Sequence, residues 1–220
     1  MPSRDGELRS LSEFESRNIL ESYGIPVVAT TLAITQQEAV EAAATTGYPV
    51  VLKGCSADLT HKSEAGAVKL NLATSAEVVA AFTAIETAAA GALDGILVQP
   101  QIRGTRELVA GMIRDPQFGP CVMFGLGGIF TEVLDDVCFR IAPLSEHDAL
   151  AMMDGIRGSA ILGPVRGTAP ADRSALSRTL IALGRIGLEN DSIQAIDVNP
   201  LLLRENGTPV AVDAAIWLTR

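Results

Sequence analysis

The chain has 220 residues, of which 48% are hydrophobic and 20% are charged, and its net charge is −9 at neutral pH. The acidic charge argues against a nucleic-acid partner, because binding a phosphate backbone needs a cationic face. No apolar run is long enough to span a bilayer, and the polar start is unlike a signal peptide. The three cysteines lack paired spacing, which argues against a disulfide framework or a zinc site, so we expect a cytoplasmic protein.

Helices and short strands alternate over the first hundred residues. Ser12, Thr35 and Thr74 are each followed three residues later by glutamate, and this spacing predicts capping boxes at three helix starts. Gly24 and Gly47 mark the ends of the first two helices. After a flexible lead over residues 1–10, we expect helices at 12–24, 35–47 and 74–91, strands at 25–34, 48–53, 66–73 and 95–100, and a loop at 54–65.

The pattern changes after residue 100. Alternating segments and glycine-rich turns favour antiparallel strands at 106–115, 121–130 and 137–143, with helices at about 145–155 and 176–188. Residues 193–216 are predicted to form a strand, a proline kink, a strand, an Asn-Gly turn and a last strand. These elements predict an α/β (α+β) domain over residues 11–220. We expect a small lobe at about 25–98, a large lobe of 11–24 plus 99–220, and a hinge near 98–102.

Several polar residues lie where strands end, and each has two interpretations. Lys53 ends a buried strand and could direct its ammonium at a phosphate, although a strand-end lysine more often reaches for water. Asp197 and Asn199 share one strand face, and Asp213 on the returning arm could meet them. Such hard oxygen ligands suit Mg²⁺, but Asn-Pro also commonly starts a turn. The amides of Gly127-Gly128 could cradle an anion or simply form a hairpin.

One of only two histidines, His61, lies in the polar stretch THKSEAG between two expected strands. A lone loop histidine is most often a solvated polar residue. A neutral imidazole is also a good nucleophile near pH 7, so its position leaves that alternative open. His147 lies at a helix start and has no such setting.

The order of the motifs is more specific than any one of them. From about Leu11 to Leu218 the chain resembles the ATP-grasp β subunit, or β domain, of the ADP-forming acyl-CoA synthetases, which are related to the succinyl-CoA synthetase β chain. The resemblance rests on LSEFESRNILESYGIPV, GYPVVLK, HKSEAGAV, ILVQPQI, ELVAGMIRDPQFGP, FGLGGIFTEVLDDVCFRIAPL, the Arg-Gly pair at 166–167, and IDVNPLLL with AVDA. It implies an ATP-grasp fold, with a nucleotide cleft between two lobes.

The resemblance also implies roles for matching positions. His61 would be phosphorylated and would carry the phosphoryl group on a swinging loop, with Asp197 near the γ-phosphate and the phosphohistidine. Asn199 and Asp213 would bind Mg²⁺. The nucleotide would be held by Lys53 at its phosphates, by the backbone of the hinge residues Gln99, Pro100, Gln101 and Ile102 at adenine, and by Glu107 near the ribose or a phosphate-bound water.

The implied function is the nucleotide-binding half of an enzyme that converts acid, CoA and ATP into acyl-CoA, ADP and phosphate. No CoA-binding GxGxxG module is evident, so we expect a partner: a CoA-binding α subunit or domain with its own phosphohistidine, in a hetero-oligomer. A nucleotide-sensing regulatory domain and a carboxylate–amine ligase are the alternatives. Two positions depart from the family pattern, Ala67 after the histidine loop and Gln101 in the hinge, and we expect nucleotide binding to survive both.

Overall fold

The computed structural model describes residues 8–57, 66–89, 93–102, 104, 106–128, 136–165 and 167–219. The chain divides into two compact units, the larger made of Met1–Ser10, Ser16–Val27 and Arg103–Arg220, the smaller of Leu11–Glu15 and Val28–Ile102. The expected lobes placed residues 11–15 in the larger one, whereas the structure groups them with the smaller unit. Glu13 explains this grouping, because it bonds to Lys53 and Gln99 of that unit.

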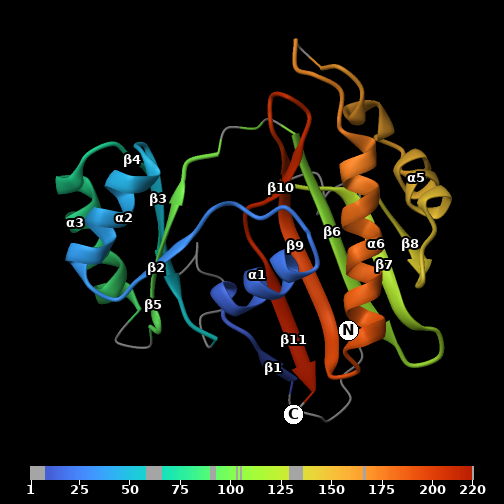
Figure 1. Cartoon of the computed structure of the whole chain (residues 1–220), viewed down its shortest axis with the longest axis horizontal. Coiled ribbons are helices and arrows are strands. Elements are labelled where there is room, and N and C mark those ends of the chain that lie inside the picture. The colour runs from blue at the N-terminus through green and yellow to red at the C-terminus, as the bar shows by residue number, and fades with distance from the viewer. Residues whose placement is uncertain are drawn as a thin grey trace. The chain divides into compact units, whose positions relative to one another are not determined.

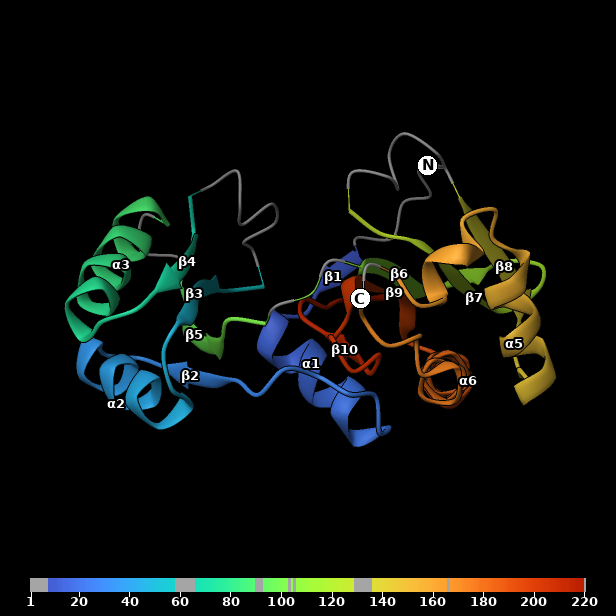
Figure 2. The same cartoon turned by 90° about the horizontal axis from the view of Figure 1, so that it is seen from above.

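The smaller unit is a four-stranded antiparallel sheet with two helices on one face (Figures 1 and 2). Its core lies between sheet and helices and contains Val50, Leu52, Ile96 and Val98. Since side chains alternate across a strand, Lys53 and Gln99 point to the opposite face. In sheet order the strands are β2 (Thr31–Ala33), β5 (Gly95–Pro100), β3 (Val50–Cys55) and β4 (Val68–Leu72), and the helices are α2 (Gln36–Thr46) and α3 (Ser75–Ala88).

The capping boxes predicted at Ser12 and Thr35 form, whereas the one at Thr74 is incomplete, because Glu77 Oε2 accepts from the N–H of Ala73. The capping box at Thr35 is complete, and the side chain of Thr74 accepts a hydrogen bond three residues into its helix. The N–H and Oγ of Ser12 both donate to Glu15 Oε2 at 2.9 Å, at the start of α1 (Glu13–Ser22). These caps satisfy donors that a helix end otherwise leaves unpaired.

The larger unit is built on a seven-stranded sheet in the order β1-β11-β9-β6-β7-β8, with β10 paired to β9. Helices α5 and α6 cover one face of this sheet (Figures 1 and 2), and Gly187 of α6 lies closely against Met112 of β6. The elements are β1 (Leu8–Ser10), β6 (Arg106–Asp115), β7 (Gly119–Leu126), β8 (Val137–Ile141), α5 (Glu146–Gly155), the 3₁₀ helix η1 (Ser159–Leu162), α6 (Arg173–Glu189), β9 (Ile193–Leu203), β10 (Pro209–Ala211) and β11 (Ala215–Thr219). Within the described ranges, no helix is long and apolar enough to cross a membrane.

Three segments differ from the sequence-based expectation. Leu8–Ser10 form β1 and pair with β11, so the expected flexible lead is wrong at these residues. The strand expected at 25–34 shrinks to Thr31–Ala33, and β3 continues to Cys55, two residues beyond the expected strand end. In each case the end of the strand is set by pairing with a strand that is distant in sequence. The local sequence does not reveal that partner.

Strand β9 runs unbroken through Asn199-Pro200, where the sequence predicted a kink between two strands. Its pairing with β6 shifts by one residue there: Leu108 lies opposite Leu201, and Ala110 lies opposite Val198. The shift marks a β-bulge, which accommodates a proline that has no N–H for the ladder. The bulge lies at Asn199, next to the predicted metal site.

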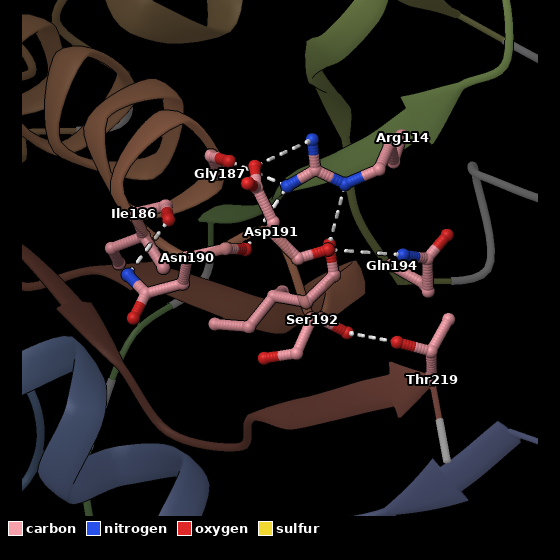
Figure 3. A network of polar contacts seen from close by, with 9 residues as sticks. Arg114, Ile186, Gly187, Asn190, Asp191, Ser192, Gln194 and Thr219 are labelled. Carbon is pink, nitrogen blue, oxygen red and sulfur yellow. Dashed lines mark hydrogen bonds and ion pairs between the residues drawn. The ribbon is translucent and has the colours of Figure 1, made fainter.

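Arg114 of β6 ties the end of α6 to the start of β9 (Figure 3). Its Nη2 donates to the carbonyls of Gly187 at 2.6 Å and Asn190 at 3.0 Å, and its Nε donates to the carbonyl of Ile193 at 3.0 Å. Carbonyls at a helix C-terminus lack intrahelical partners, and a cation there is favourable. This contact anchors the start of β9, the strand that carries Asp197 and Asn199.

Candidate functional site

The predicted metal ligands Asn199 and Asp213 lie near Asp197 in the larger unit: Asp197 and Asn199 belong to β9, and Asp213 belongs to the connection between β10 and β11. Asp197 in β9 lies opposite Ala215 in β11. The pairing of β9 with β10 keeps the same register, with Leu201 opposite Ala211. Continued across the connection between β10 and β11, this register places Asp213 opposite Asn199. The structure therefore brings two carboxylates and an amide side chain to one region of the sheet.

This region carries unfavourable negative charge. Asp197 and Asp213 are half-buried, and Asn199 is exposed. Burial raises the pKa of the Asp197 carboxyl to about 6, and the negative charge of Asp213 adds to the rise. A carboxyl whose pKa is raised by burial and by a neighbouring carboxylate marks a place where a cation is favoured.

The donor set fits Mg²⁺ held together with phosphate. In the part of the chain that the structure describes, no group of three or more His, Cys, Asp or Glu side chains could form a closed metal cage. Mg²⁺ is usually bound by one or two carboxylates and keeps its other positions for water and substrate phosphates. Asp197, Asp213 and the amide oxygen of Asn199 match that pattern.

The raised pKa of Asp197 predicts a pH-dependent stability of the metal-free chain. The folded protein keeps a proton on Asp197 up to about pH 6, whereas an unfolded aspartate loses it near pH 4. This group therefore stabilises the fold most below pH 4, and its contribution, about 1–3 kcal/mol, is lost as the pH rises through 6.

Urea unfolding at pH 4.5 and pH 7.0, in the presence of a chelator, measures this contribution. We expect Asp197→Asn to raise the stability relative to the unsubstituted chain more at pH 7.0 than at pH 4.5. An identical difference at both pH values contradicts the raised pKa.

Glu107 lies beside the glycine-rich turn. Its backbone carbonyl accepts a hydrogen bond from the N–H of Gly127 at 2.8 Å. A Cβ added at Gly128, whose φ is +66°, would lie 2.5 Å from Glu107 Oε2. The described part of the turn thus needs glycine for close packing against a carboxylate, which supports the hairpin interpretation over an anion cradle there.

Lys53 is buried in the smaller unit, so the alternative that it reaches for water is wrong. Its Nζ lies 3.1 Å from Oε1 of Glu13, and the side chains of Lys53 and Glu13 are 7% and 0% exposed. Gln99 Nε2 donates to the same Glu13 oxygen at 3.1 Å. Two residues predicted to hold nucleotide are therefore joined by a third that the sequence analysis gave no role.

A signal for Glu13 was present in the sequence. Glu13, Ser16, Arg17 and Leu20 are all buried, and they recur at the spacing of one helix face. A carboxylate in line with Leu20 on that face is unexpected for a surface helix and points to a buried partner.

The hinge residues continue the sheet of the smaller unit. Pro100 lies opposite Val50 in the pairing of β5 with β3. The backbone N–H of Gln101 donates to the carbonyl of Pro49 at 3.0 Å, and its side-chain Oε1 accepts from the N–H of Asn71 at 3.1 Å. The backbone N–H of Gln101 is therefore engaged within the unit, and Ile102 is half-buried; the adenine contact of the hinge stays a prediction. His61 lies outside the described residues.

A family model described as an ATP-grasp domain matches residues 3–218. With two antiparallel sheets, each covered by helices on one face, this match makes the chain an ATP-grasp protein and confirms the predicted fold class.

Similar proteins narrow the class. The β subunit of the ADP-forming acetate–CoA ligase I of Pyrococcus furiosus is 43% identical, over 96% of this chain and 93% of that subunit. The ADP-forming acetate–CoA ligase I of Archaeoglobus fulgidus is 40% identical over 89% of this chain, which spans 29% of that protein. The chain therefore belongs to the family of the β subunits and β domains of the ADP-forming acyl-CoA synthetases, as its motifs predicted.

A solved structure of an acetyl-coenzyme A synthetase from Ca. Korarchaeum cryptofilum has the same fold. Its TM-score is 0.85 at 43% identity, over 96% of this chain and 93% of that one. That protein is described in complex with coenzyme A and Mg-AMPPCP, with its phosphohistidine segment pointing towards the nucleotide binding site.

Proposed function

We propose that this chain is the nucleotide-binding β part of an ADP-forming acyl-CoA synthetase, which converts acid, CoA and ATP into acyl-CoA, ADP and phosphate. The observation that carries the proposal is the match to a ligase β subunit over nearly the whole of both chains. Fold alone is a weak guide to activity. The acidic pair Asp197 and Asp213 adds independent support, because it suits a metal–phosphate ligand.

In the proposed reaction, a ring nitrogen of His61 attacks the γ-phosphorus of ATP. A nitrogen–phosphorus bond forms, the bond to the β–γ bridging oxygen breaks, and ADP leaves. Asp197 accepts the N–H of the other ring nitrogen, which keeps the attacking nitrogen unprotonated. With a pKa of about 6, Asp197 is mostly ionised at pH 7 and can accept this bond.

Charge shielding comes from two sides of the nucleotide. Lys53 contributes an ammonium at the phosphates. Asn199 and Asp213 hold Mg²⁺, which when bound neutralises charge on the phosphate oxygens. The backbone of residues 99–102 holds adenine, and Glu107 lies near the ribose or a phosphate-bound water. These site assignments rest on the motif match together with the geometry described above.

The second half of the reaction belongs to a partner. We propose a CoA-binding α subunit or domain that binds the acid and CoA and carries a second phosphohistidine, in a hetero-oligomer with this chain. The near-complete match to a separate β subunit supports this division of labour.

We expect the purified chain alone to form no acyl-CoA from acetate, CoA and Mg-ATP, because in this proposal the partner binds CoA. Adding the α subunit of an ADP-forming acetate–CoA ligase is expected to restore formation of acyl-CoA and ADP, measured by chromatography. Turnover by the chain alone overturns the two-part proposal. Mg-ATP binding without any phosphorylation of the chain favours a sensing domain instead.

A further inference from the structure

A cluster of three polar side chains lies inside the smaller unit, on the sheet face away from α2 and α3. Lys53 lies in the buried strand β3, Gln99 lies near the end of β5, and Glu13 is the first residue of α1. Lys53 Nζ and Gln99 Nε2 each lie 3.1 Å from the same oxygen, Glu13 Oε1. Glu13 therefore connects the predicted phosphate-binding lysine to the predicted hinge.

Burial makes this cluster unusual. The side chain of Glu13 is fully buried and that of Lys53 is nearly so. Removing a carboxylate and an ammonium from water is costly, and apolar residues of similar size often serve stability as well or better. A buried ion pair is therefore weak evidence for a stabilising role, and a functional reason for its presence has to be considered.

The start of helix α1 fixes the position of Glu13. Ser12 and Glu15 cap the start of α1, which fixes the first residue of the helix. A negative charge at that position is favoured by the helix dipole. A carboxylate held this way limits the conformations of the lysine side chain, which otherwise rotates freely about four carbons.

We propose that Glu13 is a positioning residue for Lys53: its carboxylate holds the ammonium in the place where the phosphates of the nucleotide bind. This inference rests on the proposed function, in which Lys53 contacts those phosphates. Glu13 acts through Lys53 and does not touch the nucleotide. Its effect is therefore confined to ligands that carry phosphate.

The test compares two ligands, Mg-ATP and adenosine, on the full chain. Glu13→Gln keeps the shape of the side chain and removes its charge. By calorimetry we expect Mg-ATP affinity to fall about tenfold, with adenosine affinity unchanged. In a Lys53→Met background, adding Glu13→Gln is expected to have no further effect on Mg-ATP affinity, because the group through which it acts is gone.

The matched control is Glu15→Gln. Glu15 is exposed and lies in the same helix turn as Glu13. Its replacement by glutamine removes one negative charge, as Glu13→Gln does, and keeps an oxygen that can accept the hydrogen bond of the capping pair. We expect this variant to bind both ligands like the unsubstituted chain. If Glu13→Gln does not fold, Glu13→Asp, which keeps the charge one methylene shorter, is measured in the same way.

The outcomes separate the two proposals. Mg-ATP affinity that is unchanged in the Glu13 variant, an equal loss for both ligands, or an added loss in the Lys53→Met background overturns the positioning role. Failure of the unsubstituted chain to bind Mg-ATP at all overturns the proposed function instead.

Discussion

Replacing His61 with asparagine is expected to stop phosphorylation of the chain while leaving Mg-ATP binding intact. In the proposed mechanism His61 is the nucleophile and makes no contact that holds the nucleotide, so its loss affects the chemical step alone. Removing a nucleophile lowers a reaction rate by roughly 10³-fold or more. We expect a loss of that size both in labelling of the chain and in α-subunit-dependent acyl-CoA formation.

The measurement uses ATP labelled at the γ-phosphate. Phosphohistidine is labile to acid and stable to base, so the label on the unsubstituted chain should survive base and be released by acid. His147→Asn is the matched control, since it removes the other histidine, which lies exposed in the first turn of α5. Label that persists on the His61→Asn chain, or full turnover by that variant, contradicts the assignment.

Replacing Asp213 with asparagine is expected to weaken Mg-ATP binding at least tenfold, about 1.4 kcal/mol. The carboxylate of Asp213 lies near Asp197, and losing it removes the anionic member of the two ligands proposed for Mg²⁺, Asn199 and Asp213. The same change removes a repulsive charge beside Asp197, so the metal-free variant should unfold at the same or higher urea concentration. If Asp213→Asn loses Mg-ATP binding but keeps its stability in urea, Asp213 acts as a metal ligand and not as a structural residue.

Calorimetry with Mg-ATP, repeated with ATP in the presence of a chelator, provides the measurement. The difference between these two affinities should shrink in Asp213→Asn and likewise in Asn199→Ala. Asp191→Asn is the control, because its side chain is 98% exposed and the charge change is the same. An unchanged magnesium dependence in both site variants places the metal elsewhere.

Local features of this fold were predictable from sequence because their causes are local. A capping pair such as Thr35 and Glu38 lies within one helix turn, so four consecutive residues contain the whole interaction. The alternation of apolar and polar residues is also local, and it predicted a strand at 106–115. Strand β6 has these bounds in the structure. Asp197 and Asn199 are two residues apart in one strand, and their proximity follows from strand geometry.

The larger-scale identity of the chain was also present in the sequence, in the order of its motifs. No single motif was specific: Lys53 alone favoured a lysine that reaches for water, and Asn199-Pro200 alone left a turn and a metal site equally open. Their succession over most of the chain matched one family, and the comparisons confirm that membership. The specificity of a motif set grows with the number of independent positions that must agree.

Tertiary structure decided the rest. Leu8–Ser10 became a strand only because β11, at the other end of the chain, offers an edge to pair with. Asp213 lies near Asp197 because β10 and β11, the strands on either side of Asp213, both pair with β9. Glu13 is buried because Lys53 and Gln99, far along the chain, point at it. Sequence alone leaves such pairs open, since residues distant in the chain acquire partners only when the sheets and helices that carry them assemble.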